Sequence, residues 1–193
     1  MPEPPPGLFL LSTGTGIGGG FIKHGELFVG DSDRGMEIGH LVMVQQGPLC
    51  RCGNRGCLEA LCGEAGIRRK VEEALENGVE TKLRNADFSL EHFIQCARED
   101  RAAGIIAGEV CEYLARGLSI VVTLLNPSHV VIAGELAGLG TLLTDTVTRT
   151  LRTNCVLGTA DKLKVELSSL GRCDAARGAV LYLRRQMLAQ SIL

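Results

Sequence analysis

The chain has 193 residues, of which 45% are hydrophobic and 22% charged, and its formal net charge is -2. This composition suits one globular domain with a sizeable core, and the near-neutral charge offers no basic surface for nucleic acid. No apolar run reaches the roughly 18 residues of a membrane helix, and the N-terminus lacks the features of a signal peptide. We therefore expect a cytoplasmic protein that has no membrane partner and does not bind nucleic acid through this segment.

The N-terminal part of the sequence predicts strands around a glycine run. Residues 1–7 are rich in proline and indicate a flexible leader, and the apolar residues that follow, up to Ser12 and Thr13, predict a buried strand. The glycine run 13–20 comes next. By its residues alone it fits a phosphate-binding loop and a plain glycine hairpin equally well. Residues 21–29 predict two strands around a turn at His24.

One histidine and three cysteines stand close together in the next stretch: His40, Cys50, Cys52 and Cys57. Four nitrogen and sulfur donors are what a closed, tetrahedral zinc site needs. Gly53 and Gly56 permit the positive φ angles that such a tight loop requires. Free or disulfide-bonded cysteines are the alternative, but disulfide frameworks are typical of small secreted chains. The sequence therefore predicts a structural zinc knot.

The remainder of the chain predicts helices and strands in alternation, which is typical of an α/β layer structure. A helical pattern starts at residue 58 and contains Gly63 and Gly66, which weaken it and can divide it into two. The further elements are helices at about 89–98, 101–125, 141–152 and 175–189, the first with Ser89 and the last with Asp174 as N-cap, and strands at 129–133 and 163–167.

The stretch Glu-x-Gly-His followed by Gly-Pro-x-Cys-x-Cys-Gly-x-x-Gly-Cys-Leu-Glu resembles the signature of the ROK family of sugar kinases and sugar-responsive repressors. The resemblance covers residues 8–193 and implies the C-terminal lobe of an actin-like ATPase (ribonuclease H-like) fold with a structural zinc knot. Family kinases carry an Asp-x-Gly-Gly-Thr loop and a catalytic Asn-Asp pair upstream. Neither occurs here, so we expect the N-terminal lobe and any catalytic residue to be absent from this chain.

The resemblance also implies the site residues. Sugar hydroxyls are expected at Glu37, His40 and Glu59, and zinc at His40, Cys50, Cys52 and Cys57. The phosphates of ATP are expected at Thr13, Gly14, Thr15 and Gly16, and the nucleoside at Gly134. Family kinases usually show two or three glycines at this last position, where this chain continues with Glu135.

Three functions follow from the resemblance. The first is the sugar- and zinc-binding lobe of a kinase that phosphorylates a hexose or N-acetylhexosamine with ATP and Mg²⁺ and is inactive as this chain alone. The intact glycine run favours it. The second is the sugar-sensing and dimerisation domain of a transcriptional repressor. The third is a non-catalytic dimerisation module, since this lobe commonly forms the homodimer contact in the family.

Overall fold

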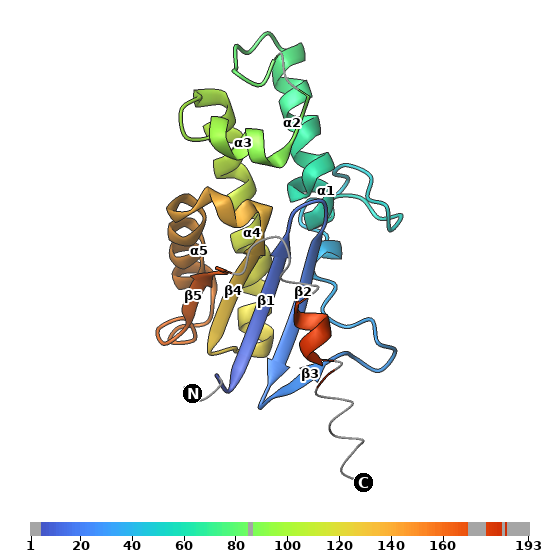
Figure 1. Ribbon diagram of the computed structural model, residues 1–193, viewed down its shortest axis with the longest axis vertical. Coiled ribbons are helices and arrows are strands. Elements are labelled where there is room, and N and C mark those ends of the chain that lie inside the picture. The colour runs from blue at the N-terminus through green and yellow to red at the C-terminus, as the bar shows by residue number, and fades with distance from the viewer. Residues whose placement is uncertain (1–4, 85–86, 170–176, 183, 185–193) are drawn as a thin grey trace.

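A mixed β-sheet runs through the centre of the molecule (Figure 1). The computed structural model describes residues 5–84, 87–169, 177–182 and 184. Within these residues the sheet has the strand order β3-β2-β1-β4-β5. The strands are β1 (Gly7–Thr13), β2 (Ile17–Lys23), β3 (Glu26–Phe28), β4 (His129–Gly134) and β5 (Lys164–Leu167). The pairs β1–β2 and β2–β3 are antiparallel, whereas β1–β4 and β4–β5 are parallel.

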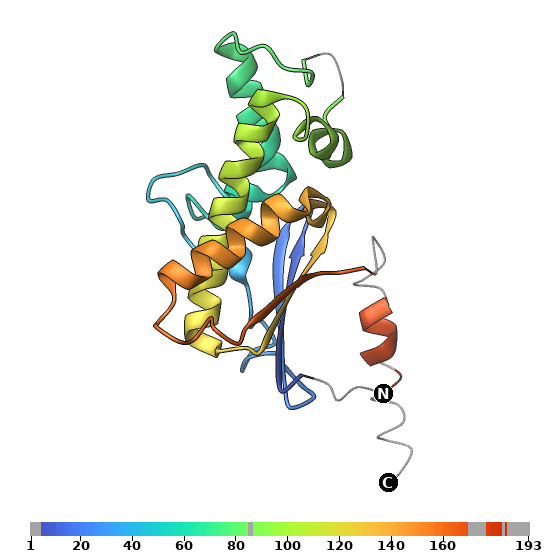
Figure 2. The ribbon, with the colours of Figure 1, turned by 90° about the vertical axis from the view of Figure 1, so that its left-hand side faces the viewer.

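Helices cover one face of this sheet and extend beyond its upper end. The α-helices are α1 (Leu58–Cys62), α2 (Glu64–Glu76), α3 (Leu90–Cys96), α4 (Arg101–Leu125) and α5 (Thr141–Asn154), with short 3-10 turns η1 (Ile38–His40) and η2 (Glu135–Leu139). Figure 2 shows α4 and α5 on the same side of the sheet, and α2 and α3 above it. Among the described residues, no helix combines the length and apolarity needed to cross a bilayer.

Two predicted segments meet the limits of the described residues. Strand β1 begins at Gly7, the last residue of the predicted leader, and the backbone N–H of His24 donates to the Pro6 carbonyl at 2.9 Å. The leader is therefore tied to the sheet at its end, while residues 1–4 lie outside the described part. Residues 177–182 are helical as predicted, but Asp174 and most of the predicted helix 175–189 lie outside it.

The core follows the alternation of the two central strands. Phe9 and Leu11 of β1 and Val130 and Ile132 of β4 are fully buried. Because successive side chains of a strand point to opposite faces, these four residues share the face that the helices cover. They belong to one apolar cluster with the buried side of α4. The sheet and the longest helix thus form one platform, from whose upper end the site is built.

The break between α1 and α2 attaches the turn after β1 to the helices. Gly63 is extended, with φ -71° and ψ 168°, and its N–H donates to the Glu59 carbonyl at 2.8 Å. The N–H of Glu64 then donates to the Gly14 carbonyl at 3.1 Å. A methyl group on Gly63 would lie 2.8 Å from the Glu59 carbonyl oxygen and 3.1 Å from that of Thr15. The predicted division of the helix at Gly63 is confirmed, and it brings this turn beside α1.

Two glycines of α4 should respond in opposite ways to alanine. A methyl group on Gly117 would lie 2.8 Å from Cδ2 of Leu58, which is fully buried, so Gly117→Ala should lower the free energy of unfolding by about 1–3 kcal/mol. A methyl group on Gly108 meets nothing within 4 Å, so Gly108→Ala should raise it by up to about 1 kcal/mol through helix propensity. Denaturant unfolding measures both changes, and shifts of the same sign would contradict the packing of α4 on α1.

Candidate metal and sugar site

The four predicted metal ligands come together at the start of α1. The ligand atoms of His40, Cys50, Cys52 and Cys57 all lie within 4.8 Å of one another. Cys50 Sγ is 3.6 Å from His40 Nδ1, and Cys52 Sγ is 3.6 Å from Cys57 Sγ. Zinc–sulfur bonds of about 2.3 Å and zinc–nitrogen bonds of about 2.0 Å give tetrahedral edges of about 3.8 Å for sulfur pairs and about 3.5 Å for mixed pairs. The donor set and its spacing therefore fit a zinc ion.

The backbone of the cysteine loop explains this convergence. The N–H of Cys50 donates to the Asn54 carbonyl at 2.8 Å, and the N–H of Gly53 donates to the Cys50 carbonyl at 3.0 Å, which closes a tight turn. Gly53 and Gly56 have φ values of 93° and 73°, in the left-handed region that favours glycine. A methyl group on Gly56 would also collide with the carbonyl of Val44. The predicted role of both glycines in the loop is confirmed.

The thiols of this cluster have different acidities. Burial, together with the neighbouring Cys52 and Cys50 sulfurs, raises the pKa of Cys57 to about 12. The pKa of the exposed Cys52 is lowered, chiefly by a hydrogen bond from the Asn54 backbone. The 3.6 Å between the Cys52 and Cys57 sulfurs is well beyond the roughly 2.05 Å of a disulfide. A bound cation would supply the charge that makes the buried Cys57 a thiolate ligand.

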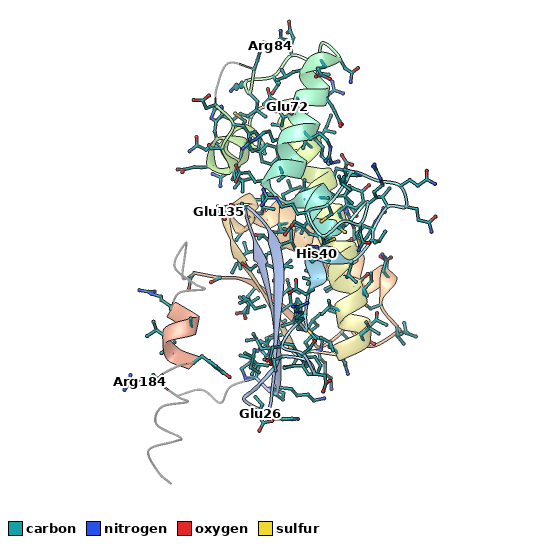
Figure 3. All side chains as sticks on the ribbon, turned by 90° about the vertical axis from the view of Figure 1, so that its right-hand side faces the viewer. Glu26, His40, Glu72, Arg84, Glu135 and Arg184 are labelled. Carbon is teal, nitrogen blue, oxygen red and sulfur yellow. The ribbon has the colours of Figure 1, made fainter. Side chains whose placement is uncertain are left out.

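His40 has one ring nitrogen on the metal cluster and the other toward Glu37. Its Nε2 lies 3.9 Å from Glu37 Oε2, while Nδ1 lies beside Cys50. The Glu37 side chain is 61% exposed and the His40 side chain 35%, so the pair is accessible to a ligand. Figure 3 shows His40 at the side of the sheet, below the α1–α2 segment. Two of the three predicted sugar contacts are thus adjacent.

Glu59, the third predicted sugar contact, also holds the turn between β1 and β2. Its Oε2 accepts a hydrogen bond from the Ile17 backbone N–H at 3.1 Å, and a methyl group on Gly16 would lie 2.7 Å from the same oxygen. Glu59 lines a small cavity of about 150 Å³, whose walls also include Gly16, Cys50 and Arg69. This structural role of Glu59 was not predicted from the sequence. Through it, Glu59 joins the turn to the metal loop.

The glycine run forms a hairpin turn of residues 14–16, because β2 already starts at Ile17. The Thr13 hydroxyl is buried and donates to the Ala133 carbonyl at 2.7 Å. The Thr15 hydroxyl donates to Glu64 Oε2 at 3.4 Å. The resemblance implies that both threonines contact the phosphates. In this conformation, however, both hydroxyls donate their hydrogen bonds to groups of the protein itself.

Gly134, the predicted nucleoside contact, lies at the end of β4 beside a large cavity. Its φ is 89°, and a methyl group there would collide with the backbone of Thr13, so only glycine fits. The cavity has a volume of about 820 Å³. Its walls come from α3, η2 and the end of β5, and they include Glu91, Arg98 and Glu135. The tertiary fold assembles this cavity from distant parts of the chain. Of the residues that line it, only Gly134 was predicted as a site residue from the sequence.

The fold and the site define a mixed α/β protein with a metal-ligand cluster beside a histidine–carboxylate pair. The ROK family model matches residues 7–186. The chain belongs to the ROK family, and the resemblance seen in the sequence is confirmed.

Relatives of both functional kinds are similar to this chain. A glucokinase of Thermotoga maritima is 37% identical over 139 residues, which cover 69% of this chain and 44% of the enzyme. The DNA-binding transcriptional dual regulator NagC of Escherichia coli K12 is 31% identical over 183 residues, which cover 93% of this chain and 44% of the regulator. The chain thus spans less than half the length of these curated relatives.

Solved structures show the same fold. A ROK family transcriptional regulator described as a homolog of E. coli MLC has a TM-score of 0.79 at 26% identity, over 84% of this chain and 41% of its own. The ROK hexokinase of Thermus thermophilus has a TM-score of 0.72 at 27% identity, over 93% of this chain and 60% of the hexokinase. A Streptomyces griseus ROK glucokinase, solved with glucose and AMPPNP, has a TM-score of 0.74 at 24% identity, which is a likeness of fold alone.

Proposed function

We propose that this chain is the sugar-binding, zinc-containing lobe of a ROK protein with an actin-like ATPase fold, and that it recognises a hexose or N-acetylhexosamine. The observation that carries the proposal is the contact of His40 with the metal-ligand cluster on one side and with Glu37 on the other. Ionised carboxylates accept hydrogen bonds from the hydroxyls of a sugar. The ion would hold the loop and the imidazole in place for this contact.

Glu37, His40 and Glu59 form the proposed sugar wall. Glu59 has one oxygen on the Ile17 N–H, and the other carboxylate oxygen remains as an acceptor for a sugar hydroxyl. The small cavity lined by Glu59 and Cys50 lies between the glycine turn and the metal loop. The lining of this cavity does not include Glu37 or His40, so a sugar that contacts all three residues would extend beyond the cavity.

Two parent proteins are compatible with this lobe. In a sugar kinase, ATP with Mg²⁺ would lie along Thr13, Gly14, Thr15, Gly16 and Gly134, and the catalytic base would come from a lobe outside this chain. The glucokinase relative and the glycine hairpin support it. In a transcriptional regulator, the lobe would sense the sugar without phosphorylating it. The match to the NagC regulator over 93% of the chain supports this second candidate. A cytoplasmic homodimer is proposed for either parent.

Glu37→Gln is the cleanest test of the sugar wall. Glu37 is exposed and its side chain contacts His40 alone among the partners described here, so the variant should keep its fold and its metal. We expect the Kd for glucose or an N-acetylhexosamine to rise at least about tenfold, because a charged acceptor becomes a neutral amide. Calorimetric titration measures the Kd, and Glu72→Gln on the exposed face of α2 is the charge-matched control. Equal sugar affinity in both variants would contradict the role of Glu37.

A further inference from the structure

Three carboxylates surround the turn at which the phosphates of ATP are expected. Glu59 accepts from the Ile17 N–H, and Glu64 accepts from the Thr15 hydroxyl. Glu135 reaches the turn from η2, and a methyl group on Gly14 would collide with its Oε2. Glu64 is paired with Arg68 at 2.9 Å. Glu59 and Glu135 therefore place carboxylate oxygens beside the turn, whereas a phosphate-binding loop offers positive charge and free donors.

The fold fixes the position of Glu135. Strands β1 and β4 are parallel neighbours, with Thr13 in register with Gly134. The hydrogen bond from the Thr13 hydroxyl to the Ala133 carbonyl ties the ends of the two strands together. Gly134, with its positive φ, then directs the chain into η2, of which Glu135 is the first residue. In Figure 3 Glu135 lies at the upper end of the sheet, next to the turn that follows β1.

We propose that Glu135 excludes nucleotide polyphosphates from this turn, so that the lobe binds its sugar without ATP. The carboxylate occupies the space over Gly14 that a phosphate oxygen would need, and its charge repels the anion at close range. The large cavity beside Glu135 also contains Arg98, but this guanidinium donates to the Gly138 carbonyl at 3.2 Å. The inference rests on the proposed function, since it concerns the nucleotide side of the same lobe. It favours the regulator over the kinase.

The test is a calorimetric titration of the full chain with AMPPNP and Mg²⁺. The unaltered chain should bind with a Kd weaker than about 1 mM. Glu135→Gly, which removes both the charge and the side chain, should bind at least about tenfold more tightly, and Glu135→Gln should show a smaller gain. Glu166→Gln, an exposed charge-matched change on β5, should behave as the unaltered chain. Thermal unfolding verifies that each variant is folded.

Two results would overturn the proposal. The first is micromolar binding of AMPPNP by the unaltered chain with no change in Glu135→Gln. The second is the absence of any gain in both folded Glu135 variants, because Glu135 would then not be the residue that excludes the nucleotide. Titration of the same samples with glucose and N-acetylglucosamine separates this inference from the proposed function. If the chain binds no sugar but Glu135→Gly gains nucleotide binding, the proposed sugar-binding function is refuted. The proposal that Glu135 excludes the nucleotide is then retained.

Discussion

With zinc in the proposed site, Cys57→Ser is expected to release the ion and to destabilise the loop that leads into α1. Cys57 is fully buried, belongs to the candidate metal-ligand cluster and is the N-cap of α1. The backbone around it joins the loop to the helix, since the N–H of Leu58 donates to the Leu41 carbonyl at 2.9 Å. A serine hydroxyl is a poor replacement for a thiolate on zinc. The three remaining ligands would leave the ion weakly held.

The size of this effect follows from binding linkage. When free zinc is a thousandfold above its Kd, the bound ion adds about 4 kcal/mol to the free energy of unfolding. For a domain of this size, loss of that contribution lowers the Tm by on the order of 10 °C. Metal analysis of the purified chain should find about one zinc per chain in the unaltered protein and less than about a tenth of that in Cys57→Ser.

Cys155→Ser is the matched control for this experiment. Cys155 is a half-buried thiol outside the cluster, and its Sγ donates to the Ser119 carbonyl at 3.7 Å. The control should retain its zinc and most of its Tm. Full zinc content in Cys57→Ser, or equal loss of zinc in both variants, would contradict the assignment of the cluster.

Elements with strong local signals were predicted well from the sequence. The bounds expected for the longest helix, 101–125, agree with α4, whose periodic apolar side packs in the core. Asp100 caps its first turn, where its side chain accepts from the N–H of Ala103, and Asn126 ends it in the left-handed conformation before Pro127. The spacing of His40 and the three cysteines also predicted a cluster that the fold does assemble. Signals of this kind lie within a few residues of the element they define.

Features that depend on distant residues were not predicted. A hairpin was one of the two alternatives for the glycine run, and the residues alone did not decide between them. Residues 17–20 belong to β2 because they pair with β1, although glycine has no preference for strands. The bond between Glu59 and the Ile17 N–H joins residues 42 positions apart, and the bond between Thr13 and Ala133 joins residues 120 apart. Pairings at such separations leave no local pattern in the sequence. The sequence therefore could not show that the hydroxyls of Thr13 and Thr15, which were expected on the phosphates, donate hydrogen bonds within the protein.

The second large effect is the dependence of sugar binding on the metal. We propose that the ion fixes His40 and the loop between Leu41 and Cys57, and that His40 and Glu37 contact the sugar from this fixed position. Without the ion, the sugar would have to order the loop as it binds, which weakens its affinity. We expect the Kd for the sugar to rise at least about tenfold after chelation and to recover when zinc is restored.

The most direct test is therefore one calorimetric titration with glucose or an N-acetylhexosamine, performed on the zinc-loaded chain, on the chelated chain and on the reloaded chain. We expect sugar binding in the first and third samples and a loss of sugar affinity of at least about tenfold in the second. The same sugar affinity in all three samples, or none in the zinc-loaded chain, would contradict a sugar site held in place by the metal cluster.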